Sequence, residues 1–423
     1  MSSTQATANP WDVIVIGGGP AGSTAATTLA QAGRRVLVLE KAKFPRFHIG
    51  ESLLPYNRQI FEDLGVWDKI SSVGFTKKRG AQFIMGNGSR RNRLDFSKGS
   101  FTEFPESIQV ERAKFDEILL NHSREAGAEV REESTVLEHR VEQDRVVIKY
   151  RAADQSEHEV HAPFLIDASG LTNFTATRES LREYYPEHRK IAIFSHFADV
   201  DMPQGEELGD ILIVRREKSW CWLIPLSPNK TSVGLVIDAA DYKALGKKPQ
   251  EVFDEAVAST PAIQMRFEQA RILEPLHVVT DFSYKNGSLV SPRVVRVGDS
   301  SGFIDPMFSS GVLLAMASAQ QGARALDDAL KTGQALTSGM KRYEKDNRRR
   351  VGIYWEFIEN FYKDHFTQLF FQPCNRWRVV CSTHAVLAGR TELSFGVWWR
   401  LRLFFFLAWL NRFVPVVKRI KVS

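Results

Sequence analysis

The first forty residues constrain this chain more than any other segment. Residues 13–16 form a short β-branched run, which is typical of a buried parallel strand. This run leads directly into Gly17, Gly19 and Gly22, which have the spacing G-x-G-x-x-G. That spacing allows a tight turn, close approach of the backbone to a pyrophosphate, and close packing of a helix on the strand. The segment Ala21–Ala32 predicts the helix, whose N-terminal amides favour a phosphate.

A second apolar run, Val36–Leu39, ends in Glu40, which is placed to accept hydrogen bonds from a ribose. A glycine motif alone is weak because a simple tight loop also explains it. Here a strand, the glycines, a helix, a second strand and the acid follow in order, so the segment predicts a dinucleotide site. Arg46 and Ser52 lie in the next loop, where they either contact the cofactor or only shape the loop.

Three later positions extend this prediction. Arg112 opens a predicted helix, Glu111–Ala126, and Asp299 follows a third buried run, where an acid can hold a ribityl hydroxyl. Asp167 either supports the cofactor domain or caps a turn. Lys77, Lys78 and Arg79, taken alone, are typical of a solvated turn.

The 423 residues suffice for two packed layers and two subdomains, and 43% hydrophobic content is ordinary for a globular enzyme. Cys221, Cys374 and Cys381 are scattered without metal spacing and favour a reducing, cytoplasmic compartment. Residues 1–10 lack the basic and apolar regions of a secretion signal.

Basic residues concentrate near the end of the chain. Residues 341–423 contain 16 Lys and Arg against 6 Asp and Glu, a charge of +10 in a chain whose total is +6. This favours an acidic partner or anionic lipid, and no nucleic-acid-binding motif is present. The apolar run Leu403–Leu410 is far shorter than the ~20 residues of a bilayer span. It predicts an interfacial helix, a partner-binding face or, as the first choice, a helix packed back onto its own domain.

The pattern turns to β from about residue 190 to residue 238, which predicts an antiparallel sheet over the first domain and a substrate pocket between them. Trp220 and Trp222 are two residues apart and therefore share one face of a strand, where a core pair is the alternative to a functional one. A small-residue turn, 300–311, precedes a predicted helix, Val312–Leu330, and offers its amides to an anion or a flavin edge.

With these segments in hand, the chain resembles the flavin-dependent halogenases from Trp11 to about Gly322. The glycine motif, Glu40 and Gly298-Asp299 are shared by FAD monooxygenases in general, whereas residues 50–55, G-E-S-L-L-P, are narrower. The defining motifs are W-x-W-x-I-P, matched by Trp220, Trp222, Ile224 and Pro225, and F-x-x-P-x-x-S-x-G, matched by Phe303, Pro306, Ser309 and Gly311.

The resemblance implies an α/β fold with three parts. These are a Rossmann-like FAD-binding domain of the p-hydroxybenzoate hydroxylase-like type (1–185 and 285–335), an antiparallel β-sheet substrate domain (186–284) and a helical C-terminal region (336–423). The expected FAD contacts are Gly17, Gly19, Ala21, Gly22, Glu40, Arg46, Ser52, Arg112 and Asp299.

The resemblance also implies the chemistry. Reduced FAD from a separate flavin reductase and O2 would oxidise chloride or bromide, held beside Ser310 and Gly311, to hypohalous acid. The acid would then reach Lys78, the lysine of the family pattern G-F-x-x-K-x-G-A, and be held by a hydrogen bond or as a haloamine. An amine suits this role because burial lowers its pKa. Lys77 is the fallback if the register differs by one residue.

One departure narrows the substrate class. Tryptophan halogenases have a glutamate where this chain has Phe308, which cannot exchange a proton. This favours the phenol- or pyrrole-directed branch, whose substrates are often tethered to an acidic carrier protein. Two alternatives are a flavin hydroxylase or polyprenyl reductase, and a non-catalytic FAD-binding component of a membrane or complex. A second nicotinamide-binding motif is not evident, which fits a separate source of reduced flavin.

Overall fold

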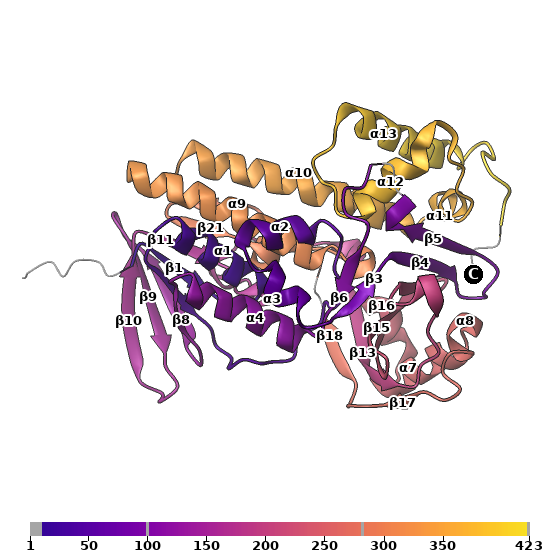
Figure 1. Cartoon of the computed structure of the whole chain (residues 1–423), viewed down its shortest axis with the longest axis horizontal. Coiled ribbons are helices and arrows are strands. Elements are labelled where there is room, and N and C mark those ends of the chain that lie inside the picture. Colours follow the sequence, from indigo (N-terminus) through magenta and orange to yellow (C-terminus); the bar gives the residue numbers. More distant parts are fainter. Residues whose placement is uncertain (1–10, 99–100, 281–282, 421–423) are drawn as a thin grey trace, which may run out of the picture.

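The apolar runs near the N-terminus form neighbouring strands of one sheet (Figure 1). The computed structural model describes residues 11–98, 101–280 and 283–420. Every strand pair in this sheet is parallel except β20 and β21, which pair antiparallel at one edge. The strand order is β20 (Val290–Ser291), β21 (Val294–Arg296), β11 (Phe164–Asp167), β1 (Val13–Ile16), β2 (Val36–Leu39) and β7 (Glu129–Arg131).

Different layers cover the two faces of this sheet, because alternate side chains of a strand point to opposite sides. Val13 and Val15 pack with α1 (Pro20–Gln31) and α9 (Gly311–Thr332), and α4 (Arg112–Glu125) lies beside α1. The opposite face packs against a three-stranded antiparallel sheet of β8 (Thr135–Val141), β9 (Val146–Arg151) and β10 (Glu157–Ala162). The predicted helices over 21–32, 111–126 and 312–330 are confirmed with ends shifted by one or two residues.

The predicted β region forms most of an eight-stranded sheet. Its members are β17 (Arg271–Ile272), β13 (Lys190–Ala198), β16 (Lys230–Asp238), β15 (Ser219–Ser227), β14 (Ile211–Arg215), β4 (Gly80–Met85), β5 (Arg91–Asp95) and β18 (His277–Thr280), which pairs with β13. Strands β4 and β5 come from the range 1–185, so an early segment of the chain completes this sheet. One face packs against α7 (Pro249–Ala258) and α8 (Pro261–Gln264), and the other carries Trp220 and Trp222.

The three consecutive cations do not form a solvated turn. Lys77 and Lys78 end β3 (Thr76–Lys78), which pairs with β6 (Ser107–Gln109). Alternation along a strand sends neighbouring side chains to opposite sides. Lys77 is therefore exposed and paired with Glu106, whereas Lys78 is completely buried.

Short elements connect these layers. They are α2 (Asn57–Leu64), α3 (Trp67–Ser71), α5 (Phe174–Arg178), α6 (Ala239–Leu245), β12 (Arg182–Tyr184), β19 (Tyr284–Asn286) and β22 (Gly302–Phe303).

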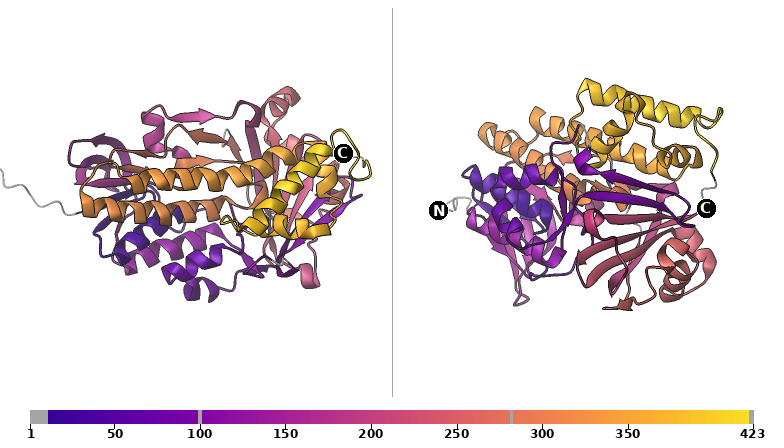
Figure 2. Two further views of the ribbon diagram at one scale, coloured as in Figure 1. Left: turned by 90° about the horizontal axis from the view of Figure 1, so that it is seen from above. Right: turned by 45° about the vertical axis from the view of Figure 1, so that its right-hand side comes forward.

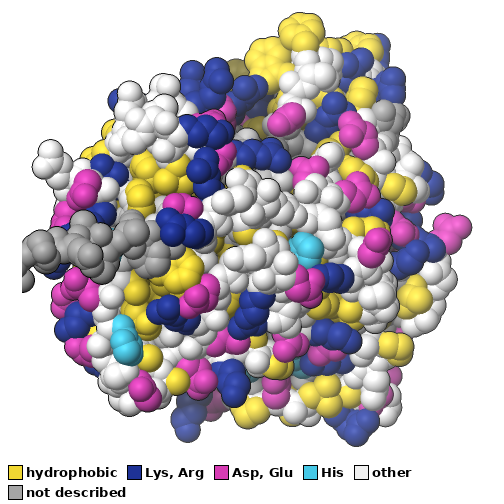
Figure 3. Space-filling view, turned by 60° about the vertical axis from the view of Figure 1, so that its left-hand side comes forward, with side chains coloured by type: hydrophobic (Ala, Val, Ile, Leu, Met, Phe, Trp, Pro, Cys, Tyr) yellow, Lys and Arg dark blue, Asp and Glu magenta, His cyan; other side chains and the backbone are white. Residues whose placement is uncertain are grey.

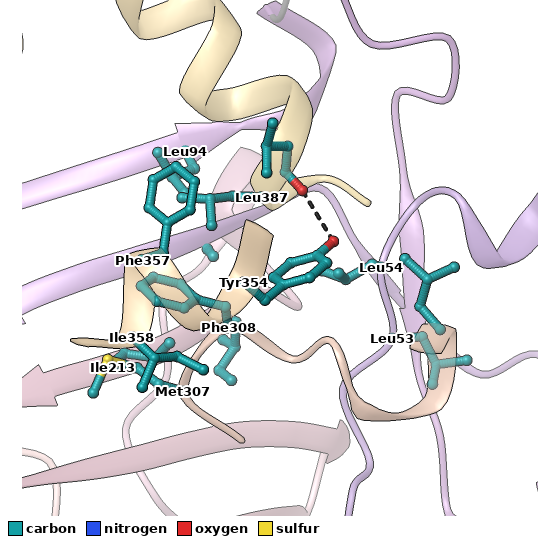
Figure 4. Close-up of a cluster of buried hydrophobic side chains, with 14 of the residues drawn as sticks. Leu53, Leu54, Leu94, Ile213, Met307, Phe308, Tyr354, Phe357, Ile358 and Leu387 are labelled. Atoms are coloured by element: carbon teal, nitrogen blue, oxygen red, sulfur yellow. Dashed lines mark hydrogen bonds between the residues drawn. The ribbon is translucent and has the colours of Figure 1, made fainter. Parts of the chain in front are cut away.

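The C-terminal region is helical, as predicted. It contains α10 (Ser338–Phe361), which runs alongside α9 (Figure 2), followed by α11 (Asp364–Phe370), α12 (Val379–Leu387) and α13 (Phe395–Leu410). Aromatic side chains join these helices to the eight-stranded sheet: Phe357 and Phe361 pack on Phe308, and Phe361 also packs on Phe83. Tyr354 donates a hydrogen bond to the carbonyl of Val386, shown as the dashed line in Figure 4.

Helix α13 contains the apolar run and packs back onto the molecule on one side. Val397, Leu401, Phe404 and Ala408 recur at helical spacing and are buried. The exposed large hydrophobic side chains of α13 are Phe395, Trp398, Phe406 and Trp409. Among the described residues, no helix has the length and apolar character needed to cross a bilayer.

Candidate active site

The glycine loop between β1 and α1 is closely packed. A side chain at Gly22 would place its Cβ 1.8 Å from the carbonyl oxygen of Gly17, so only glycine fits there. Gly17 itself has a φ of +96°, in the region that favours glycine. Glu40 fixes the same loop: its Oε2 accepts a hydrogen bond from the Gly18 amide at 2.6 Å, and its Oε1 accepts one from the Ala42 amide at 2.8 Å.

The buried carboxylate of Asp116 holds two arginines, Arg46 and Arg112, beside this loop. Arg112 donates two hydrogen bonds to Asp116, at 2.7 and 2.8 Å, and a third to the Ile49 carbonyl at 2.6 Å. Arg46 donates to Asp116 at 3.3 Å. A guanidinium held in this way is preorganised for anionic oxygens.

A cavity of about 660 Å³ extends from the glycine loop to the eight-stranded sheet. Its wall includes eight of the nine predicted cofactor residues: Gly17, Gly19, Ala21, Glu40, Arg46, Ser52, Arg112 and Asp299. The ninth, Gly22, lies behind the wall, where it packs on Gly17. Enclosure raises the pKa of Asp299 to about 6, although Arg112 opposes that shift. The far end of the cavity is apolar, with Phe194, Trp220, Trp222 and Ile224.

Lys78 lies immediately behind this wall. Its Nζ donates to Ser52 Oγ at 2.8 Å and to the Leu53 carbonyl at 2.9 Å. Burial lowers the pKa of Lys78 to about 7, although the attraction of Asp210 acts in the opposite direction. A buried amine with this pKa is a hydrogen-bond donor and a nucleophile near neutral pH.

The residues of the second motif have two different surroundings. Phe303, Pro306, Ser309 and Gly311 line the cavity. Ser309 adopts a left-handed conformation, with φ +57°, and its Oγ donates to Ser52 Oγ at 3.2 Å. Ser310 is buried and does not line the main cavity, but it lines an adjoining small cavity of about 20 Å³ that shares Asp299, Phe303 and Gly311 with the main one.

The tryptophans of the first motif are fixed by polar contacts as well as packing. Trp220 Nε1 donates to Tyr362 Oη at 3.0 Å, and that hydroxyl donates to Asp305 Oδ2 at 2.6 Å. Trp222 Nε1 donates to Ser232 Oγ at 3.1 Å, and its indole fills the space beside Gly234. Tyr362, Asp305 and Gly234 were missed by sequence reasoning, because their partners lie far away along the chain.

Two other positions singled out in the sequence have structural roles rather than contacts with the cavity. Asp167 accepts hydrogen bonds from the amides of Ser169 and Thr175, which is the turn-capping alternative. Phe308 is buried among Phe83, Phe357 and Phe361. The position that holds a glutamate in tryptophan halogenases is therefore part of an apolar cluster in this chain.

Comparisons with known proteins agree with this geometry. A family profile described as FAD binding domain matches residues 10–357. A chlorinase of 1H-pyrrole-2-carbonyl peptidyl-carrier protein from Pseudomonas fluorescens is 30% identical over 377 residues, which cover 84% of each chain. A brominase of the same type of substrate from Pseudoalteromonas luteoviolacea is 34% identical over 326 residues, covering 75% of this chain and 76% of its own. The chain belongs to the flavin-dependent halogenases.

Solved structures give the same family. The myxobacterial chondrochloren halogenase CndH is 31% identical and superposes with a TM-score of 0.80, covering 94% of this chain and 97% of its own. This flavin-dependent halogenase therefore has the α/β fold and the FAD cofactor that the sequence predicted. The cavity fits FAD, because the glycine loop admits a close-lying pyrophosphate and the held arginines face the same space.

Proposed function

We propose that Lys78 carries the activated halogen from the flavin cavity to an electron-rich aromatic ring. Reduced FAD, when bound, supplies the activation of O2 that converts chloride or bromide to hypohalous acid. We place the halide at the N-terminus of α9, beside Ser310 and Gly311, because free helix amides favour an anion and Gly311 lines the cavity. Lys78 then holds the hypohalous acid by a hydrogen bond or as a haloamine.

The contact between Lys78 and Ser52 is the observation that supports this proposal most strongly. The amine lies one hydroxyl group behind the cavity wall, within hydrogen-bond distance of Ser52, which lines the cavity. At a pKa of about 7, roughly half of the amine is neutral at neutral pH, whereas an exposed lysine is almost fully charged. Lys77, the fallback, points to solvent and is paired with Glu106.

We further propose a pyrrole- or phenol-type ring as the substrate, delivered on an acidic carrier protein. The names of the Pseudomonas and Pseudoalteromonas relatives support a carrier-bound pyrrole. Phe308 supports a ring that needs no carboxylate beside it. A separate flavin reductase would supply reduced FAD, since the sequence shows one glycine motif of the dinucleotide type.

The test is a reconstituted reaction with a flavin reductase, NADH, O2 and either chloride or bromide. Pyrrole-2-carbonyl carrier protein, free pyrrole-2-carboxylate and a panel of phenols serve as substrates, and mass spectrometry detects halogen in the product. Halogenation of the carrier-bound ring alone would support the full proposal. Hydroxylation without halogen incorporation, unchanged in Lys78→Ala, would overturn it.

The exposed side of α13 is the surface we assign to the carrier. Trp398, Phe406 and Trp409 are exposed there, and the exposed Arg412 follows the end of the same helix. Figure 3, which brings the left-hand side of Figure 1 forward, shows hydrophobic and basic side chains together along its upper edge. Aromatic and arginine side chains are enriched at the centres of interfaces, and the basic charge attracts an acidic carrier.

Peripheral membrane contact is the competing role for this surface. Trp409→Ala with Arg412→Ala should raise KM for the carrier-bound substrate and leave turnover of a free ring unchanged. Flotation of the full chain with anionic vesicles, lost in the same double variant without a change in KM, would assign the surface to a membrane instead.

A cytoplasmic location, expected from the cysteines, stays a prediction; all three cysteines are free thiols.

A further inference from the structure

A line of three titratable side chains connects the cavity to the molecular surface, and the steps above use none of them. His196, in β13, is buried, and its Nε2 lies 2.6 Å from Glu51 Oε1. Its Nδ1 lies 2.7 Å from Glu274 Oε1, which is an ion-pair distance but not a hydrogen bond, because Glu274 Oε1 has no hydrogen-bond partner among the described residues. Glu51 forms part of the cavity wall, and the Glu274 side chain is 34% exposed. The imidazole therefore bridges an inner and an outer carboxylate.

The inner end of this line is incompletely satisfied. Glu51 is 1% exposed, and its Oε2 has no hydrogen-bond partner within the described part of the chain. Leaving a buried acceptor without a partner costs about 1–3 kcal/mol, and more for a charged group. The cost is offset if a bound group or a proton on the cavity side occupies that oxygen. Arg112 is close enough to be influenced by the Glu51 charge, so a cation also faces the inner end.

The outer end is fixed and shielded. The His196 carbonyl accepts a hydrogen bond from the Leu273 amide at 2.8 Å, and Ser195 Oγ donates to the Glu274 carbonyl at 2.6 Å. The ring of Phe47 packs edge-on against His196 and stacks on His277. His277 Nε2 lies 3.9 Å from Glu274 Oε1 and is the other titratable group at this end. Glu274 is thus the exit of His196 toward water.

This cluster is not a metal site. Among the described residues, no group of three or more His, Cys, Asp or Glu side chains could hold a metal ion. A neutral imidazole, in contrast, accepts a proton on one nitrogen and releases one from the other, and a carboxylate on each side suits such a transfer.

Halogenation requires such a proton. Reduced FAD, O2, a halide ion, an arene C–H and one proton give FAD, the aryl halide and two water molecules. The reduced flavin supplies two electrons, and the bond formed is carbon–halogen. One proton per turnover must therefore enter the cavity.

We propose that Glu274, His196 and Glu51 form a proton relay that delivers this proton from solvent to the flavin end of the cavity. The Glu274 carboxyl first turns to align with His196 Nδ1 and passes its proton there, while His196 Nε2–H transfers its proton to Glu51. Glu51 then presents it to the cavity. The proposal rests on the halogenase reaction but not on the role of Lys78, because Lys78 contacts Ser52 and Leu53 and not these residues.

The experiment compares Glu274→Gln, His196→Ala and a control, Glu268→Gln, whose side chain is exposed. Three quantities are measured: the FAD dissociation constant by fluorescence, the rate of flavin reoxidation at 450 nm in single turnover with halide, and its solvent deuterium isotope effect. We expect Glu274→Gln to slow reoxidation about 10-fold and raise the isotope effect, with FAD affinity unchanged. Imidazole should restore His196→Ala, and the control should match the wild type.

A readout without flavin keeps the proposal falsifiable if His196→Ala does not fold. In 15N-labelled apoprotein, Glu274→Gln should shift the His196 Nδ1 resonance, and Glu268→Gln should not. Wild-type reoxidation rates in Glu274→Gln with an altered Nδ1 resonance would overturn the relay. So would a slow His196→Ala that imidazole does not restore, because that result indicates only a positioning role. If Lys78→Ala halogenates the ring as fast as the wild type, the proposed role of Lys78 fails and the relay is unaffected.

Discussion

Lys78 Nζ and Ser52 Oγ lie 2.8 Å apart, with the hydroxyl on the cavity wall and the amine behind it. Ser52 was predicted as a cofactor contact, but its position gives it a second partner at the amine. Ser309 Oγ donates to the same hydroxyl. The loop of residues 50–55 and the turn before α9 therefore meet at the group that separates the flavin space from the lysine.

The first prediction concerns this hydroxyl. Ser52→Ala removes one of the two acceptors of Lys78, which stabilise its charged form more than its neutral form, so the pKa of Lys78 should fall below about 7. If the neutral amine is the active form, the acidic limb of the pH–rate profile for ring halogenation should move to lower pH. Ser309→Ala, which leaves the Lys78 contact intact, is the control. An unchanged limb in Ser52→Ala would contradict the assignment.

The buried amine should also make stability depend on pH. Its pKa is about 7 in the folded chain and near 10.5 when unfolded, so the unfolded state binds more protons between these values and wild-type stability rises with pH there. Lys78→Met removes the cost of burying the charge. We expect it to raise the free energy of unfolding by roughly 1–3 kcal/mol at pH 6, and by less at pH 9.5. Urea unfolding at both pH values measures this; an advantage that grows with pH would contradict the burial argument.

The next prediction asks whether packing prevents a glutamate at position 308. Phe308→Glu would bury a carboxylate among Phe83, Phe357 and Phe361. We expect a loss of about 3–5 kcal/mol in stability and no activity on tryptophan. Phe308→Leu, the matched apolar change, should cost about 1 kcal/mol. A folded Phe308→Glu that halogenates tryptophan would show instead that this position selects the substrate.

Gly234 should not tolerate a larger side chain, because the Trp222 indole packs directly against it. A Cβ at this position would lie 2.2 Å from Trp222 Cζ2, and the Ser232 contact holds the indole in place. Gly234→Ala should therefore cost about 1–3 kcal/mol in thermal or urea unfolding. Gly352, on the exposed side of α10, has no atom within 4 Å of a built Cβ. Gly352→Ala should be neutral or slightly stabilising, and equal costs for the two variants would contradict the packing argument.

The sequence contained most of the cofactor site because that site is built from local patterns. The glycine loop, Glu40 and α1 belong to one continuous segment. Once β3 is known, strand alternation is enough to predict that the Lys77 and Lys78 side chains point to opposite sides. The solvated turn that the three consecutive cations favour when taken alone does not form, because pairing with β6 is a tertiary effect that local charge does not reveal.

Contacts between distant segments could not be predicted in this way. Glu51 and His196 are 145 residues apart, and Trp220 and Tyr362 are 142 apart. A buried His in a β-strand reads as an ordinary core residue until the facing carboxylates are seen. Helix α13 shows the same limit: its apolar run does not reveal which aromatic side chains pack inward and which remain exposed.

The central claim is that the halogen reaches the ring through the Lys78 amine, and the most direct measurement separates formation of hypohalous acid from ring halogenation. Wild type, Lys78→Ala and Lys77→Ala are supplied with enzymatically reduced FAD, O2 and chloride. A small-molecule trap measures released hypohalous acid, and mass spectrometry measures chlorinated ring. We predict that Lys78→Ala still forms hypohalous acid but loses at least about 100-fold in ring chlorination, while Lys77→Ala behaves as wild type. Ring chlorination that persists in Lys78→Ala at the wild-type rate would contradict the account.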